Sequence, residues 1–237
     1  MTHLPSLLDR LNNPKISKIE IGQRQIFSRL IADTRLRQES KALSVSCGDG
    51  IWDYLALQGN FGLGAIDATD IVECPVKPSD QQLLRTHGAW RFHRVQPDSR
   101  LPFDDGFFDL VFHQDVIEHT ERPYSFMREQ CRVLRGGTVI VGTPNLLRPM
   151  NCLKALMGKL HFPALIGRNE EIGNYVHVQE FHAMQLNLLL EEAGFTNVML
   201  YHIYFGLSMS NIYFSLLPKG SIGKTFAHFL MAKGVKA

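Results

Sequence analysis

The chain has 237 residues, of which 45% are hydrophobic, and its 25 lysines and arginines nearly balance its 23 aspartates and glutamates. This length fits one domain with a substantial buried core. The near-neutral charge argues against a nucleic-acid partner, which would call for a basic face to neutralise phosphates.

The cysteines form no Cys-x-x-Cys pair and have no metal-ligand spacing (Cys47, Cys74, Cys131 and Cys152). We therefore expect no metal and reduced thiols in a cytoplasmic protein. Residues 1–18 hold no apolar run of signal-peptide length, and no segment reaches the roughly 18–20 apolar residues that span a bilayer. We expect no stable membrane insertion, and the sequence leaves the oligomeric state open.

Residues 1–40 are predicted to form an N-terminal helical arm. Residues 1–15 are polar with two prolines, and residues 16–36 carry Ile19, Ile26, Leu30 and Ile31 at roughly helical spacing. This helix either packs on the edge of the sheet or also covers the ligand site.

Residues 42–50 predict a strand, a tight turn and a helix start. The strand-like run with Leu43 and Val45 meets two glycines, Gly48 and Gly50, and a helical pattern begins at Ile51. Glycine adopts positive φ freely and lets a ligand approach the bare backbone. A helix N-terminus favours an anionic group.

A second strand-like run, residues 63–66, ends at Asp67, 17 residues after Gly50. A carboxylate there can accept both hydroxyls of a ribose. These two units together predict a nucleotide-type ligand site.

Strand and helix patterns then alternate along the chain. We expect helical segments around 81–85, 124–134 and 186–193, and strands at 92–95, 107–112, 138–141 and 198–205. Gly136 and Gly137 are predicted to end the second of these helices and Gly194 the third. The last strand has two candidates, 211–217 and 225–232, and we favour the second as an antiparallel partner.

This alternation indicates a doubly wound α/β sheet with its ligand at the carboxyl ends of the strands. Asp67 and residues 97–99, 113–115 and 143–145 fall at such ends. Residues 146–176 interrupt the pattern, with a short helix capped by Asn151. This insertion is either a lid or substrate pocket or packing filler, and its helix could also lie on a membrane surface.

From about residue 41 to residue 195 these motifs resemble the class I S-adenosylmethionine-dependent methyltransferases, in particular the type 11 branch. Similar members include the O-methyltransferase of ubiquinone biosynthesis and enzymes of bacterial surface-glycan clusters. The resemblance rests on residues 43–50, 65–67, 101–103, 108–111, 115–119, 132–137, 143–145, 177–181 and 189–195, in the family's order and spacing. It implies a Rossmann-like, seven-stranded, mostly parallel sheet with an antiparallel last strand, in a domain spanning 41–237 with an insertion at 146–176.

The resemblance also implies S-adenosylmethionine as cofactor and a role for each matching position. The methionine end of the cofactor would lie on Ser46, Cys47, Gly48, Asp49 and Gly50, and its ribose on Asp67. Asp98 or Ser99 would lie near the adenine. His113 and Gln114 would flank the sulfonium, and residues 115–119 would line the acceptor side.

Two positions depart from the family pattern. An acidic residue usually stands where Ser44 is, and a glycine where Ser46 is. Ser46 is strained if its φ is positive. The acidic residue before Leu101 is displaced by one position, which weakens the adenine assignment.

Transfer of a methyl group to oxygen needs positioning and often a base, and histidine suits that role. His113, His119 and His177 are the candidates, and we select His119 and His177 as catalytic residues. Structural roles remain open, as a helix start for His119 and a loop anchor for His177. Glu118 is either a base or a stabiliser of the cofactor loop.

The resemblance therefore implies a methyltransferase, most simply one acting at oxygen on a small-molecule or sugar-containing acceptor. A nicotinamide dehydrogenase would need a third glycine where Asp53 stands. A methyltransferase acting on the amino groups of nucleic-acid bases would show a characteristic signature after the fourth strand, and that signature is absent at residues 113–116. The remaining alternative, motivated by Ser44 and Ser46, is a catalytically impaired protein that keeps the fold as a binding or scaffold module.

Overall fold

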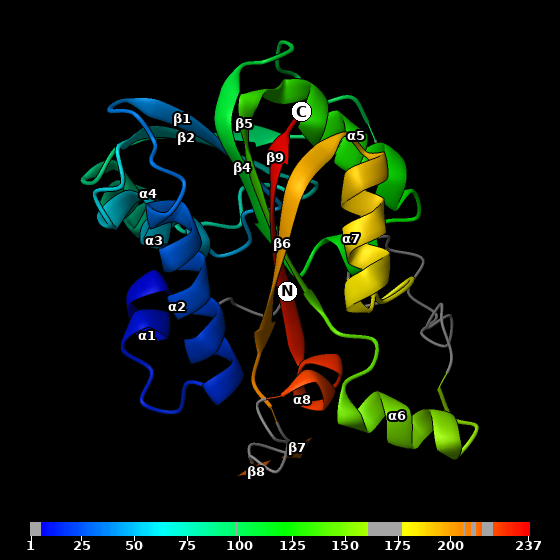
Figure 1. The fold of residues 1–237 in the computed structure, drawn as a ribbon. Coiled ribbons are helices and arrows are strands. Elements are labelled where there is room, and N and C mark those ends of the chain that lie inside the picture. Colours follow the sequence, from blue (N-terminus) through cyan, green and yellow to red (C-terminus); the bar gives the residue numbers. More distant parts are fainter. Residues whose placement is uncertain (1–5, 98, 161–176, 206, 210–211, 215–219) are drawn as a thin grey trace.

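The computed structural model describes residues 6–97, 99–160, 177–205, 207–209, 212–214 and 220–237 (Figure 1). The strands of the main sheet are β1 (Ser40–Val45), β2 (Leu63–Asp70), β3 (Ala89–Arg94), β4 (Phe108–Gln114), β5 (Leu134–Pro144), β6 (Phe195–Ile203) and β9 (Phe229–Lys236). The helices are α1 (Leu7–Leu11), α2 (Lys18–Ala32), α3 (Ile51–Gln58), α4 (Pro78–Arg85), α5 (Pro123–Val133), α6 (Pro149–Leu156), α7 (Ala183–Glu192) and α8 (Ser221–Thr225), with a 3-10 turn, η1 (Ile117–His119).

The seven strands lie in the order β3-β2-β1-β4-β5-β9-β6. The β3-β2-β1-β4-β5 part is parallel, and β9 runs antiparallel to both of its neighbours. This confirms the predicted fold class. A separate two-stranded sheet pairs β7 (Leu207–Met209) with β8 (Ile212–Phe214).

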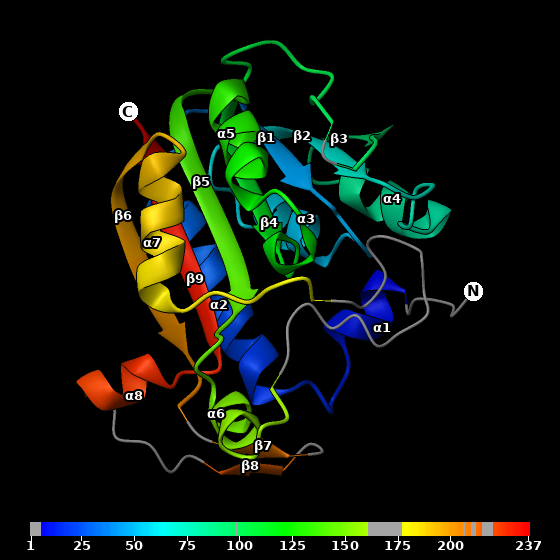
Figure 2. The same ribbon diagram turned by 90° about the vertical axis from the view of Figure 1, so that its right-hand side faces the viewer.

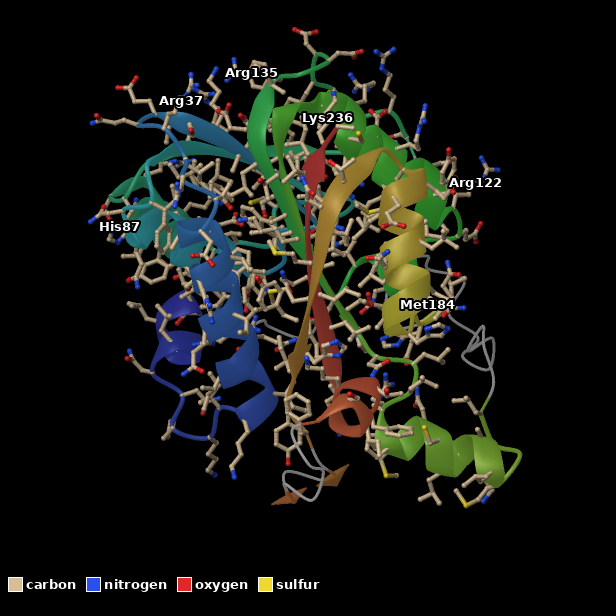
Figure 3. All side chains as sticks on the ribbon, viewed as in Figure 1. Arg37, His87, Arg122, Arg135, Met184 and Lys236 are labelled. Atoms are coloured by element: carbon tan, nitrogen blue, oxygen red, sulfur yellow. The ribbon has the colours of Figure 1, made fainter. Side chains whose placement is uncertain are left out.

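Helices cover both faces of the main sheet. Helices α2, α3 and α4 lie on one face, and α5 and α7 lie on the other (Figures 1 and 2). β4 shows why, because its side chains alternate between two apolar clusters: Leu110 and Phe112 pack on the α2–α3 side and Val111 on the α5–α7 side. A strand buried on both faces needs such a continuous apolar run. Charged side chains such as those of Arg37 and Arg135 lie at the periphery (Figure 3).

The last strand of the main sheet is β9, which overlaps the favoured candidate, residues 225–232. It begins later than predicted, at Phe229, and ends at Lys236. The other candidate, 211–217, overlaps β8 of the small sheet. Residues 211 and 215–217 lie outside the described residues.

Two local predictions are wrong. Helix α5 ends at Val133, and Leu134 already has extended backbone. Gly136 and Gly137 therefore belong to β5, where a Cβ on Gly137 would lie 2.2 Å from the carbonyl oxygen of Asp109. Glycine permits the close approach of β5 to β4 and does not cap the helix.

The second correction concerns α6, which begins at Pro149 and not after Asn151. Proline suits a first helical position because it lacks the N–H that would go unpaired there. Asn151 lies inside the helix and its side chain bonds elsewhere, as described below.

In the N-terminal part, α1 is capped by Ser6, whose hydroxyl accepts from the Asp9 backbone N–H while the Asp9 carboxylate reaches back. The backbone N–H of Leu7 donates to Asp80 of α4 at 2.9 Å. The division into an arm and a domain remains a prediction. Among the described helices, none is long and apolar enough to cross a membrane.

Candidate cofactor and acceptor site

A cavity of about 720 Å³ opens at the carboxyl ends of the parallel strands. A volume of this size suits a cofactor or drug-sized ligand. The lining comes from segments that follow β1, β2, β3 and β4, together with α5 and His177: residues 45–46, 48, 69–72, 75, 95–97, 99–101, 115–116, 119–121, 125–126, 129–130 and 177.

The turn after β1 has the backbone that the sequence predicts. Ser46, Gly48 and Gly50 all have positive φ, at 57°, 53° and 82°. Ser46 and Gly48 line the cavity, and a Cβ on Gly48 would meet nothing within 4 Å. A ligand can therefore approach the bare backbone here, and the strain expected of Ser46 is present.

Three other predicted residues of this turn face the protein. Cys47 is buried, and a Cβ on Gly50 would touch Val76 at 3.3 Å. Asp49 accepts from the Ile51 backbone N–H at 3.2 Å and forms an ion pair with Arg10. Asp49 thus fixes the start of α3 and ties the turn to the N-terminal arm.

The ribose assignment made from the sequence falls on a residue away from the cavity. β2 continues three residues past Asp67, because Ala68 and Thr69 keep pairing with β1 and β3. The Asp67 carboxylate bonds to the His93 ring at 2.7 Å and is absent from the cavity lining.

Asp70 is the carboxylate that stands at the end of β2 and lines the cavity. It accepts from the backbone N–H groups of Ile71 at 2.8 Å and of Gly48 at 3.3 Å. The second bond ties the end of β2 to the glycine turn. Burial raises the pKa of Asp70, and the backbone N–H groups oppose that rise. The sequence analysis ended this strand too early. The run Asp67-Ala-Thr-Asp70 offers two carboxylates separated by residues that a strand accepts, so the strand could equally have been extended to Asp70.

Ser44, which stands where the family usually has an acidic residue, is buried behind the turn. Its surroundings explain why a serine fits there. Asp53 of α3 is fully buried and accepts from the Trp90 indole N–H at 2.7 Å. Burial raises the pKa of Asp53 to about 7, and the Ser44 hydroxyl and the Trp90 indole oppose that rise. A carboxylate at position 44 would add a second buried negative charge beside the first.

The predicted adenine side is partly described. Ser99 lines the cavity together with Gln96 and Pro97, which follow β3. Asp98 lies outside the described residues.

His113 and Gln114 are not brought to the cavity, because β4 extends through both of them and is covered on both faces. Burial lowers the pKa of His113 to about 3, so its ring is neutral, and the ring packs edge-on against Phe126. Asp115 is the first residue past β4, has a φ of 54°, and lines the cavity. A positive φ in an aspartate is uncommon and is often found at functional sites.

On the acceptor side, His119 and His177 line the cavity together, with ring centroids 4.9 Å apart in an edge-to-face arrangement. Glu118 is fully buried beside them and accepts from the Thr143 hydroxyl at 2.9 Å. Burial raises the pKa of Glu118, and the charge of Asp115 raises it further.

A buried ion network holds His177 in place. Its Nδ1 lies 2.6 Å from Glu180, whose carboxylate also accepts from Arg148 at 2.7 Å and from the Asn151 side-chain amide at 2.8 Å. Burial alone would raise the pKa of Glu180, but the bonds from His177 and Arg148 lower it. The sequence analysis missed Glu180 and Arg148, because 32 residues separate them and no local pattern links them.

Comparisons with known proteins agree with this geometry. Residues 43–141 match the family model of the type 11 methyltransferase domain. A probable S-adenosylmethionine-dependent methyltransferase of Mycobacterium tuberculosis is 35% identical over 154 residues, which are 61% of this chain and 50% of that relative. The chain thus spans about half the length of such mycobacterial relatives.

Demethylmenaquinone methyltransferase of Staphylococcus aureus is 26% identical over 200 residues, or 80% of either chain. Among solved structures, the magnesium protoporphyrin IX methyltransferase of Synechocystis PCC 6803, with bound S-adenosylhomocysteine, has a TM-score of 0.59 at 16% identity and covers 93% of this chain and 86% of its own. At that identity the likeness speaks for the fold alone.

The strand order and the turn after β1 place the protein in the class I methyltransferase fold. The match over residues 43–141 and the similarity to a probable S-adenosylmethionine-dependent methyltransferase agree with the predicted family and cofactor. The predicted fold class is confirmed.

Proposed function

We propose that the protein transfers the methyl group of S-adenosylmethionine to an oxygen of a small-molecule or sugar-containing acceptor. The supporting observation is one cavity lined by two unlike sets of residues. One set is the open turn at Ser46 and Gly48 with the Asp70 carboxylate, and the other is His119 and His177. A cofactor and an acceptor could meet between them.

The residues present fit S-adenosylmethionine. A carboxylate at the end of the second strand can accept ribose hydroxyls, and in our proposal Asp70 takes this role in place of Asp67. The backbone at Gly48 would hold the methionine end, and Gln96 and Ser99 would lie near the adenine. When bound, the cofactor supplies an electrophilic methyl group.

The acceptor would lie beside His119 and His177. If Nδ1 of His177 donates its proton to Glu180, Nε2 carries the lone pair. Such a nitrogen can take the proton of an acceptor hydroxyl as the oxygen is methylated. Asp115, held at the turn after β4, would shape the space between cofactor and acceptor.

Calorimetric titration with S-adenosylmethionine and S-adenosylhomocysteine tests the cofactor half. We expect micromolar binding by the wild-type protein, weakened at least tenfold in Asp70→Asn because a carboxamide accepts less strongly from ribose hydroxyls. Asp67→Asn is the matched control, three residues away on the same strand, and should change affinity less than threefold. Equal losses in both variants, or a larger loss in Asp67→Asn, would restore Asp67 as the ribose ligand.

The acceptor half is tested by methyl transfer from labelled cofactor to a panel of hydroxyl-bearing acceptors. The panel should include quinone precursors, because one relative is named for demethylmenaquinone, and sugar nucleotides. Transfer to oxygen supports the proposal. If the protein binds neither S-adenosylmethionine nor S-adenosylhomocysteine up to millimolar concentrations, it would instead be a binding or scaffold protein.

A further inference from the structure

Three metal-ligating side chains meet at the acceptor end of the cavity. Glu118, His119 and His177 each offer one ligand atom, and these atoms all lie within 4.8 Å of one another. We infer that they bind one first-row divalent ion of the zinc type. Two imidazoles and one carboxylate are a ligand set found in catalytic sites for such ions.

Glu118 supplies the first independent observation. One of its carboxylate oxygens accepts from Thr143, and the other is buried without a hydrogen-bond partner among the described residues. A buried, unpartnered carboxylate oxygen is costly. A cation at this point would give that oxygen its missing partner.

His177 supplies the second observation. Its Nδ1 is bonded to Glu180, which is itself held by Arg148 and Asn151. Histidines that bind metals commonly donate their other ring N–H to a carboxylate, which fixes the tautomer and the ring orientation. His177 therefore has the hydrogen-bonded carboxylate that commonly orients a metal-binding histidine.

Further carboxyl groups lie close to the three ligands. Those of Asp115 and Glu180 lie near Glu118, and Arg148 and His177 pair with Glu180. His119 and His177 are both half-buried and line the cavity. Bonds of about 2.1 Å in a tetrahedron place ligand atoms about 3.4 Å apart, so each ligand atom must move by about 1 Å to complete the site.

Three protein ligands leave a fourth position toward the cavity. Water or an oxygen of the acceptor could occupy it, a consequence that rests on the proposed function, whereas binding of the ion does not. Ion binding and the direct base role of the imidazoles are mutually exclusive, because both use the same lone pairs.

The test is calorimetric titration of ZnCl₂ into the full chain after treatment with a chelator, together with the visible absorption spectrum after addition of Co²⁺. We expect one ion per chain at micromolar affinity or tighter, and intense Co²⁺ bands of a four-coordinate site. His119→Ala and His177→Ala should each weaken binding at least tenfold and reduce these bands. His87→Ala is the matched control, since His87 is an exposed histidine that follows α4 (Figure 3) and does not line the cavity, and this variant should bind as the wild type does.

Thermal unfolding of every variant checks that the fold is intact. Glu118→Gln, which keeps the shape of the side chain, gives a further readout and should also lose at least tenfold in affinity. Absence of binding up to 100 µM Zn²⁺, or unchanged affinity in both histidine variants, would overturn the site and leave the imidazoles to act as bases.

Discussion

The groups that form the cofactor half and the acceptor half of the cavity differ in kind. The cofactor half is mainly backbone: three positive φ angles within five residues, and N–H groups of Gly48 and Ile71 that hold Asp70. The acceptor half is made mainly of side chains: Glu180 joins His177 and Arg148, and Glu118 accepts from the Thr143 hydroxyl.

The two halves also treat buried carboxylates differently. Glu180 has a guanidinium and an imidazole beside it. Asp53, beneath the glycine turn, is fully buried and has the neutral Trp90 indole as its hydrogen-bond donor. A buried charged group is tolerated when an opposite charge pairs with it. Without such a partner, its pKa shifts so that the uncharged form is favoured. Removing the charge of Asp53 and removing the cationic partner of Glu180 should therefore have opposite effects on stability.

The largest expected effect is at Asp53, where Asp53→Asn should stabilise the protein at pH 8. The pKa of Asp53 is about 7 in the folded protein and near 3.8 in the unfolded chain. The folded state thus holds the proton more tightly, so stability falls as pH rises from about 4 to about 7 and then levels off. The variant should be more stable by up to about 4 kcal/mol at pH 8 and within about 1 kcal/mol of wild type near pH 4.

Urea denaturation at both pH values measures this difference. Asp104→Asn, an exposed aspartate, is the control and should show little change. A difference that is the same at pH 4 and pH 8 would show that the carboxyl charge is not its cause.

The second effect is opposite in sign and lies in the acceptor half. Arg148→Met should destabilise the protein by about 3 kcal/mol, because it leaves the Glu180 carboxylate, only 1% exposed, without its guanidinium. Denaturant unfolding at pH 7 measures the loss. Arg135→Met breaks an exposed pair with Asp109 and should cost less than about 1 kcal/mol. Similar losses in the two variants would mean that the Glu180 network does not stabilise the acceptor half.

The contrast also explains what could be predicted from the sequence. The glycine turn and the strands around it follow from local patterns, because φ preferences and apolar runs act over a few residues. The alternation of strands and helices indicated the doubly wound sheet for the same reason.

The remaining features depend on contacts between distant segments. The local sequence allows β2 to end at Asp67 or at Asp70, and pairing of its last residues with β1 and β3 decides for Asp70. Glu180 and Arg148 meet because β5 and the segment before α7 lie side by side, as the bridge between Asn145 and Phe181 shows. Gly137 was assigned to a helix end because its need for space arises from the neighbouring strand.

The smallest effect returns to the cofactor half. Ser46 has a φ of 57°, which costs a residue with a Cβ about 1 kcal/mol relative to glycine. Glycine at position 46 would remove this cost, but its greater conformational entropy in the unfolded chain offsets part of the gain in stability. Ser46→Gly should therefore raise stability by about 0.5 kcal/mol, or the melting temperature by about 1–2 °C.

Asn60→Gly is the matched control for this substitution. Asn60 has a similar φ of 51°, but asparagine tolerates that region better, so the melting temperature should scarcely change. The strain at Ser46 is present with or without ligand, so cofactor affinity in Ser46→Gly should stay within about twofold of wild type. If instead the glycine variant bound the cofactor and the natural chain did not, Ser46 would be the residue that disables the turn, and the scaffold alternative would hold for the natural protein.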